Sequence, residues 1–272
     1  MAQLESFLSP RTDVSLLMRF AFTGIKGQYD SLLQGLIALA EEEPWTCETE
    51  NDILKAYINK TFEKCFQQKD ILVSQDENYA CFDSGLLSRK LEKIYGLFVK
   101  NDRDTPYWKL KRFCPESETE ILKNFPTKPK KTDYFSNPED YYFNPKAEIT
   151  PNLIHFFDEE ENVFDRLPED IKKLPPEDII ALIKGKIGIL KDRIERNPRI
   201  VIPLYYKDKI TFACPISIMN HDLALIIGKY EGDAYRVNTI FPLSITYKKA
   251  RMLMRPEANW LALFKEKDAT EL

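Results

Sequence analysis

Histidine and paired cysteine, the side chains that build most zinc sites and many active sites, are scarce in this sequence. Of the 272 residues only two are histidines, His155 and His221, and neither stands in an H-x-x-x-H or H-E-x-x-H arrangement. The five cysteines are scattered and never spaced as C-x-x-C. A zinc site or a disulfide framework is therefore not expected, and reduced thiols in a cytoplasm fit the pattern better. The acidic run at 156–166 lacks the alternating ligands of a calcium loop, so no metal is expected there.

Long apolar runs and an excess of positive charge are also missing. No stretch of about 18 apolar residues occurs, so no transmembrane helix is expected, and the first residues lack the pattern of a signal peptide. The formal net charge is −4 and the pI is about 5.5, which excludes a uniformly basic nucleic-acid coat and leaves room for a local basic patch. P-loop, dinucleotide and kinase signatures are absent, so no cofactor is predicted. We expect a cytoplasmic protein that is not in a membrane.

Hydrophobic periodicity predicts helices and strands in alternating blocks. Helical spacing of apolar residues predicts helices over 30–43, 50–67, 175–197 and 243–255. Short β-branched and aromatic runs predict strands at 70–74, 79–83, 92–99, 107–113, 200–206, 209–218, 222–230 and 233–240. This order favours an α+β fold with a curved, mostly antiparallel sheet flanked by helices. We expect an N-terminal helical segment over 1–49 and a single domain over 50–272, whose two halves share one sheet or pack tightly.

The segment 115–150 differs in amino-acid composition from the predicted helices and strands on either side of it. Its run PTKPKKTDYFSNPEDYYFNPKAEITP combines prolines, charges and aromatic residues, which indicates an extended arm lying on its own protein or on a partner. Residues 132–145 are the part that we expect to contact a protein partner, if there is one. The run begins near four lysines that are either solvated or in contact with phosphate: Lys123, Lys128, Lys130 and Lys131.

A cluster of small polar residues stands in the stretch CFDSGLLSRK, residues 81–90. Asp83, Ser84 and Gly85 follow one predicted strand and precede another, which is typical of an Asx-type turn closed by glycine. The same residues also suit a polar loop that faces a ligand, because Gly85 can adopt a positive φ and present backbone N–H groups to an anion. A nucleophilic serine is the least favoured reading, since no histidine base is near in the sequence.

The helix predicted over 243–255 carries two stripes. One is apolar and suits a core: Leu243, Tyr247, Ala250 and Met254. The adjoining stripe carries a hydroxyl and three cations: Ser244, Lys248, Arg251 and Arg255. Guanidinium groups match phosphate oxygens, so this stripe is either a contact for phosphate or RNA or a solvated helix face.

Four other residues are candidates on chemical grounds. Asp222 begins an apolar strand, where an unpaired carboxylate would be costly, so we expect it to be paired, with Arg251 as the candidate partner. Tyr95, Tyr235 and Thr239 lie in predicted strands. Tyrosines of this kind either stack on bases, as in single-strand binders, or belong to the core.

Three blocks occur in order across about residues 50–262: ILKAYINKTFEKC, YACFDSGLLSRKLEKIYGLF and HDLALIIGKYEGDAYRVNTIFPLSITYKKARMLMRPEANWL. Together they resemble an uncharacterised, mostly bacterial domain family of unknown function. Its members have an F-N-T-G-L block and a terminal T-L-x-x-A-Y-x-N-A-R-L…RP…WL block. Members are found fused to cold-shock and LOTUS-type (OST-HTH) RNA-binding modules. The resemblance implies a nucleic-acid-associated or nucleotide-binding module in RNA metabolism, stress response or phage defence.

The sequence departs from the family pattern at a few positions. Asp83 and Ser84 stand where Asn and Thr are usual, and Ser244 stands where Asp is usual. An acid is thus gained at position 83 and lost at position 244. This argues against a fixed catalytic carboxylate at either position and fits a family member that binds a ligand without catalysing a reaction.

The favoured function is ligand binding in a pocket between the first hairpin and the final helix. Its candidate residues are Asp83, Ser84, Gly85, Tyr95, Tyr235, Thr239, Tyr247, Arg251 and Arg255. One alternative is an enzyme acting on a nucleotide or an RNA phosphate, with Asp83 or Asp222 as acid, base or metal ligand. Another is a non-catalytic subunit that binds its partner through 132–145. The residues alone leave these three open.

Overall fold

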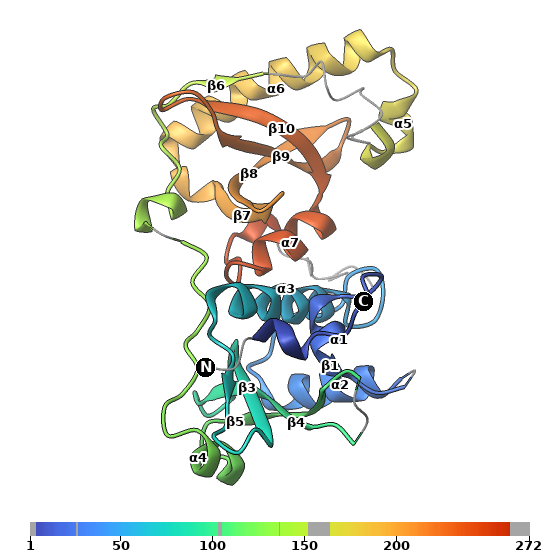
Figure 1. The fold of residues 1–272 in the computed structure, drawn as a ribbon. Helices are drawn as coiled ribbons and strands as arrows, with labels where there is room; N and C mark the ends of the chain where they lie inside the picture. Colours follow the sequence, from blue (N-terminus) through green and yellow to red (C-terminus); the bar gives the residue numbers. More distant parts are fainter. Residues whose placement is uncertain (1–3, 26, 103–104, 136, 152–163, 262–272) are drawn as a thin grey trace, which may run out of the picture. The chain divides into compact units, whose positions relative to one another are not determined.

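A computed structural model describes the chain except for residues 1–3, 26, 103–104, 136, 152–163 and 262–272 (Figure 1). The chain divides into two compact units, Met1–Tyr134 and Phe135–Leu272. Each contains one five-stranded, mostly antiparallel sheet together with helices, so the predicted α+β class is confirmed. Strands of the two units form separate sheets, which differs from the shared sheet that was one of the two expected arrangements. No helix of the described residues has the length and apolar character needed to cross a membrane.

The sheet of the first unit has the strand order β1-β5-β4-β3-β2. Its strands are β1 (Ala21–Phe22), β2 (Leu72–Val73), β3 (Tyr79–Leu87), β4 (Lys93–Lys100) and β5 (Trp108–Pro115). The pair β1–β5 is parallel and the other pairs are antiparallel. The four strands predicted in this half are confirmed in place and type. Strand β1 was not predicted, because two residues are too short to show a period.

Helices of the first unit pack on this sheet and build an aromatic core. They are α1 (Leu16–Phe20), α2 (Gln28–Leu39), α3 (Asp52–Gln68) and α4 (Thr119–Asn124), with the 3₁₀ turn η1 (Leu4–Phe7) before them. Phe62 of α3 meets Phe82 and Phe98 of the sheet edge to face, with ring centroids 5.2 and 5.8 Å apart. A second apolar cluster contains Tyr95 of the sheet and Ile121 of α4. Burial of these side chains fixes which face of β3 and β4 each residue occupies.

The sheet of the second unit has the order β6-β10-β9-β8-β7. Its strands are β6 (Ile149–Thr150), β7 (Ile202–Tyr206), β8 (Lys209–Ile218), β9 (His221–Lys229) and β10 (Tyr235–Pro242). Strand β6 pairs parallel to β10, and the remaining pairs are antiparallel. The four strands predicted in this half are confirmed. Strand β6 lies inside the segment read as an arm, which also contains α4 and the 3₁₀ turn η2 (Pro138–Tyr141).

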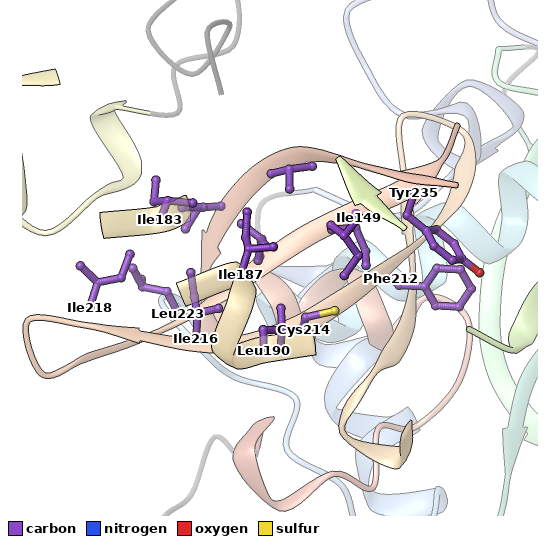
Figure 2. Packing of buried hydrophobic residues seen from close by; sticks show 14 of the residues in the cluster. Ile149, Ile183, Ile187, Leu190, Phe212, Cys214, Ile216, Ile218, Leu223 and Tyr235 are labelled. Atoms are coloured by element: carbon purple, nitrogen blue, oxygen red, sulfur yellow. The ribbon is translucent and has the colours of Figure 1, made fainter. Parts of the chain in front are cut away.

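Helix α6 (Pro176–Arg196) covers one face of this sheet (Figure 2). Its buried side chains recur at spacings of three and four: Ile179, Ile183, Ile187, Leu190 and Ile194. Figure 2 shows Ile183, Ile187 and Leu190 packed beside side chains of β8 and β9. Pro176 and two acidic residues occupy the first turn, as the sequence predicts for a helix start.

The last helix, α7 (Leu243–Arg251), is shorter than the predicted 243–255. The chain turns at residues 252–254, and Pro256 then disfavours a helical conformation at Arg255. Arg255 is therefore exposed outside the helix and does not continue the stripe that contains Arg251. The short elements α5 (Glu169–Lys172), η4 (Phe164–Arg166), η5 (Pro198–Ile200) and η6 (Asn259–Leu261) complete the unit.

Candidate functional site

The candidate residues from the sequence divide between the two units. The first unit contains Asp83, Ser84, Gly85 and Tyr95. The second contains Asp222, Tyr235, Thr239, Tyr247, Arg251 and Arg255. Each group is considered within its own unit.

Asp83, Ser84 and Gly85 lie within strand β3 and not in the turn between two strands. The ladder with β4 pairs Asp83 with Tyr95 and resumes at Leu87 with Lys93, so a bulge separates these pairs. The connection itself is made by residues 88–92, where the Leu91 N–H donates to the Ser88 carbonyl. The three residues are therefore not the connection between two strands, but the predicted Asx-type bond is present within the bulge, since the Gly85 N–H donates to the Asp83 carboxylate.

Local hydrogen bonds explain the residue types at Ser84 and Gly85. The Ser84 hydroxyl donates to the Ile94 carbonyl at 2.6 Å and accepts from the Leu86 N–H at 3.2 Å. Gly85 has φ +75°, and a Cβ at this position would lie 2.5 Å from the hydroxyl oxygen of Tyr57. The Gly85 N–H donates to the Asp83 carboxylate at 2.7 Å. That bond uses the N–H which the sequence interpretation assigned to an anion.

Asp83 and Tyr95 form a polar centre under this bulge. Asp83 is 3% exposed, and burial raises the pKa of its carboxyl above the ordinary value, although the Gly85 N–H and then the charges of Lys93 and Lys131 partly offset the effect. Tyr95 is fully buried, and its hydroxyl has no hydrogen-bond partner among the described residues. Burial also raises the pKa of Tyr95. The arrangement places a protonatable carboxyl beside a neutral phenol.

The first part of the arm packs on its own unit. Lys128 Nζ donates to the carbonyls of Ile121 and Phe125 at 3.2 and 2.7 Å, which satisfies the last turn of α4. The Thr132 hydroxyl lies 2.9 Å from Cys65 Sγ on α3, and burial raises the pKa of that thiol to about 12. Lys128 therefore has a structural role, and Cys65 is not a reactive thiolate.

A pocket of about 410 Å³ lies in the second unit, where the arm meets the β9–β10 hairpin. Its lining residues are Glu139, Tyr142, Phe143, Asn144, Lys229, Gly232, Asp233 and Tyr235. The Tyr142 side chain is 74% exposed. Phe143 packs on Tyr235 with ring centroids 4.4 Å apart, and the Tyr235 hydroxyl accepts the Asn144 N–H at 3.0 Å. A ring contact and a hydrogen bond thus join two segments of the pocket lining that are about ninety residues apart in the sequence.

Charges of both signs surround this pocket. Lys229 pairs with Asp140 at 2.8 Å, and that hydrogen bond raises the pKa of Lys229. Two further carboxylates, of Glu139 and Asp233, lie in the lining. On the same hairpin the Arg236 guanidinium lies over the Tyr230 ring, 4.9 Å from its centroid. The pocket therefore offers an exposed ring, hydrogen-bonding groups and one cation, Lys229, that is paired with Asp140.

Thr239 belongs to a second group of cations and aromatic rings. It is fully buried next to a bulge in β10, and its hydroxyl accepts from Arg166 Nη1 at 3.4 Å. Arg166 lies over the Phe241 ring at 5.2 Å from its centroid, and Lys249 over the same ring at 5.7 Å. Arg166 could not be predicted as a neighbour of Thr239, because the two residues are about seventy positions apart in the chain.

The remaining candidates differ in exposure. Asp222 is exposed near the start of β9, opposite Ser217, so it needs no partner to compensate for burial, and the premise of a costly buried carboxylate is wrong. Arg251 is 6% exposed and Tyr247 is 4% exposed. The interpretation of this stripe as a solvated helix face is therefore wrong for Arg251, whereas Arg255 is exposed to solvent.

The two histidines and the acidic run give no metal site in the described part of the chain. His221 Nε2 lies 2.9 Å from Asp170 at the surface, and that hydrogen bond lowers the pKa of Asp170. His155 and most of the acidic run at 156–166 lie outside the described residues. Within the described ranges, no group of three or more His, Cys, Asp or Glu side chains could hold a metal ion.

Fold and pocket together define an α+β protein with one sheet in each of two units and a mixed polar and aromatic pocket in the second. The family model of a domain of unknown function, DUF3825, matches residues 36–260. Because this match spans most of the chain, the protein belongs to the DUF3825 family, and membership of an uncharacterised domain family is confirmed. The comparisons with curated proteins and with solved structures gave no match.

Proposed function

We propose that the protein is a nucleotide- or RNA-binding module, and that the pocket beside the β9–β10 hairpin holds one nucleoside of the ligand. The observation that carries this proposal is the exposed Tyr142 ring at the edge of a pocket of about 410 Å³. A volume of this size is within the range of small-molecule sites. An exposed aromatic ring is the group on which proteins stack single-stranded bases.

The polar groups of the pocket suit the edges of a nucleoside. The Tyr235 hydroxyl accepts the Asn144 N–H, so its own proton is left for another acceptor. The carboxylates of Glu139 and Asp233 can accept hydrogen bonds from exocyclic amines or ribose hydroxyls. Tyr235, a candidate from the sequence, thereby gains a role in hydrogen bonding, while its ring packs against Phe143.

The charge balance separates the nucleoside from its phosphate. Glu139 and Asp233 disfavour a phosphate inside the pocket, and Lys229 is already paired with Asp140. A phosphate of the ligand is therefore expected to lie outside the pocket lining. The resemblance to proteins fused with cold-shock and LOTUS-type modules supports the same proposal. It extends the proposal to RNA metabolism, stress response or phage defence in the cytoplasm.

The test begins with protein purified at low salt, whose A260/A280 ratio and native mass reveal any bound nucleotide. Calorimetric titration then compares mononucleotides and short single-stranded RNA on wild type, Tyr142→Ala and Tyr142→Phe. We expect Tyr142→Ala to weaken binding by about ten-fold, since loss of one base stack costs about 1–3 kcal/mol, and Tyr142→Phe to retain affinity because it keeps the ring. A bare protein that binds none of these ligands would refute the proposal.

A second candidate function is an enzyme that uses Asp83 as a general acid. The observation that favours it is the buried Asp83 carboxyl with a raised pKa beside the unpartnered hydroxyl of Tyr95. Asp222 is exposed, so it is the weaker of the two catalytic candidates. Loss of hydrolysis of a nucleotide or RNA in a folded Asp83→Asn protein would support this candidate. A protein partner bound through 132–145 stays a prediction.

A further inference from the structure

The outer face of helix α6 carries an apolar seam that the fold of the chain does not use. Leu182 is 37% exposed and Ile189 is 57% exposed. Gly185 lies between them at spacings of three and four residues, so the three positions share one side of the helix. This seam points away from the isoleucines that pack on the sheet, because those occupy the intervening positions. The helix therefore has two apolar sides, of which one is exposed.

Two glycines on this outer face, Gly185 and Gly188, are not required by packing against the described residues. Apart from the adjacent residues and the backbone of α6 itself, no atom of the described residues lies within 4 Å of a Cβ built on Gly185 or on Gly188. Glycine is a poor residue for a helix interior, and alanine would fit at both places without a clash. Ala181, Gly185 and Gly188 form a stripe of small residues next to Leu182 and Ile189. Small residues at such positions allow the backbone of another helix to approach closely.

We propose that this seam binds α6 of a second copy of the chain, with the two helices antiparallel about a twofold axis next to Gly185. Leu182 of one copy then lies opposite Ile189 of the other, and Asp178 lies opposite Arg193 of the other, because both pairs have the same midpoint in the sequence. A twofold interface of this kind is self-complementary. Each large apolar side chain also faces the small stripe of the second copy.

The distribution of charge selects a second copy as the occupant and fixes its direction. Glu177 and Asp178 are in the first turn of α6, and Arg193 and Arg196 are in the last. The antiparallel arrangement places acid against base and aligns the helix dipoles favourably, whereas a parallel pair in register would place acid against acid. The last turn also contains Asp192 and Glu195, which reduce its net charge. The attraction between the two ends is therefore modest.

The length of the helix sets the expected strength. A helix of 21 residues is about 30 Å long. One helix pair of this length buries less than the ~800 Å² per partner of a standard stable interface. We therefore expect a weak, reversible dimer that forms as the protein concentration rises.

The experiment measures mass against concentration by sedimentation equilibrium on the full chain. Ile189→Glu is expected to weaken dimerisation by about ten-fold or more, since it replaces an apolar contact of the seam with a charge. Leu122→Glu is the matched control, because Leu122 is 56% exposed on helix α4 of the other unit. A monomer at every concentration would overturn the proposal, and so would a dimer that Ile189→Glu leaves unchanged.

Charge-exchange and cysteine variants test the register. Asp178→Arg and Arg193→Asp are each expected to weaken the dimer, and the double exchange is expected to restore it, because it restores both ion pairs with their signs reversed. A cysteine introduced by Gly185→Cys should form a disulfide between copies under mild oxidation, while one introduced by Leu122→Cys should not. Absence of both the restoration and the selective cross-link would refute the antiparallel arrangement, even for folded variants with unchanged circular dichroism.

Discussion

Replacement of Gly85 by alanine tests the account of the β3 bulge most directly. Gly85 has φ +75°, and an added Cβ would lie 2.5 Å from the Tyr57 hydroxyl oxygen but 3.7 Å from Tyr57 Cζ. The first value is a clash and the second is an ordinary contact. The substitution therefore introduces two separable costs, one from the backbone conformation and one from the Tyr57 hydroxyl.

The two costs have different sizes and different remedies. A left-handed conformation costs a residue with a Cβ roughly 1–2 kcal/mol, and overpacking in a filled interior costs about 1–3 kcal/mol. We expect Gly85→Ala to lower the free energy of unfolding by about 2–5 kcal/mol. In a Tyr57→Phe background the clash is absent, so the same substitution should cost only the backbone part, roughly 1–2 kcal/mol.

Urea denaturation of the four proteins of this double-mutant cycle measures both parts. Trp45 and Trp108 are buried in the first unit, so tryptophan fluorescence reports its unfolding. The coupling energy between positions 85 and 57 should be about 1–3 kcal/mol. A coupling energy near zero, or a Gly85→Ala protein as stable as wild type, would refute this description of the bulge.

Three other changes have defined expected outcomes. Ser84→Ala removes the hydrogen bonds to Ile94 and Leu86 and should cost about 1–3 kcal/mol in thermal denaturation. Lys128→Met removes the side-chain donor to the Phe125 carbonyl just after α4 and one of two donors to the Ile121 carbonyl, and should lower protection at the end of that helix in hydrogen exchange. Burial raises the pKa of Asp83 in the folded protein above its pKa in the unfolded chain. The contribution of this carboxyl to stability is therefore fully present below the unfolded pKa and is lost as the pH rises through the folded pKa. Urea titration at each pH compares Asp83→Asn with wild type. From about pH 4 upwards, the free energy of unfolding of the variant should therefore rise relative to that of wild type.

The parts of the fold that the sequence predicted well are long and strongly periodic. Helix α6 differs from its predicted bounds by one residue at each end, and strand β8 has the predicted bounds. In such segments many side chains repeat the same signal, so the period decides the element. Helix α4 has six residues and one buried side chain, and it was missed because so short a segment shows no period.

The candidate site was harder to predict, because its residues are brought together by tertiary structure. Tyr235 was a candidate, but Tyr142 and Asn144 come from the arm, and their position beside β10 has no local sequence signal. The concentration of prolines and aromatic residues in the arm was the available sign that it packs on something. At the bulge the residue types were right and the element was wrong, since glycine with φ +75° serves turns and bulges alike.

Among the three residues of the bulge, Asp83 is the one that local structure does not require. Gly85 is fixed by its φ and by Tyr57, and Ser84 by two hydrogen bonds. The bond from the Gly85 N–H to Asp83 would form equally well to the amide oxygen of asparagine. Asparagine carries no charge, so it would avoid the cost of desolvating a carboxylate, which is the effect that raises the pKa of Asp83. A buried carboxyl that an amide could replace without loss of this hydrogen bond is a candidate for a functional role. If Asp83→Asn stabilises the protein at pH 7 and also removes a ligand or an activity, the carboxyl belongs to a site. If it stabilises the protein and changes nothing else, the carboxyl has no functional role.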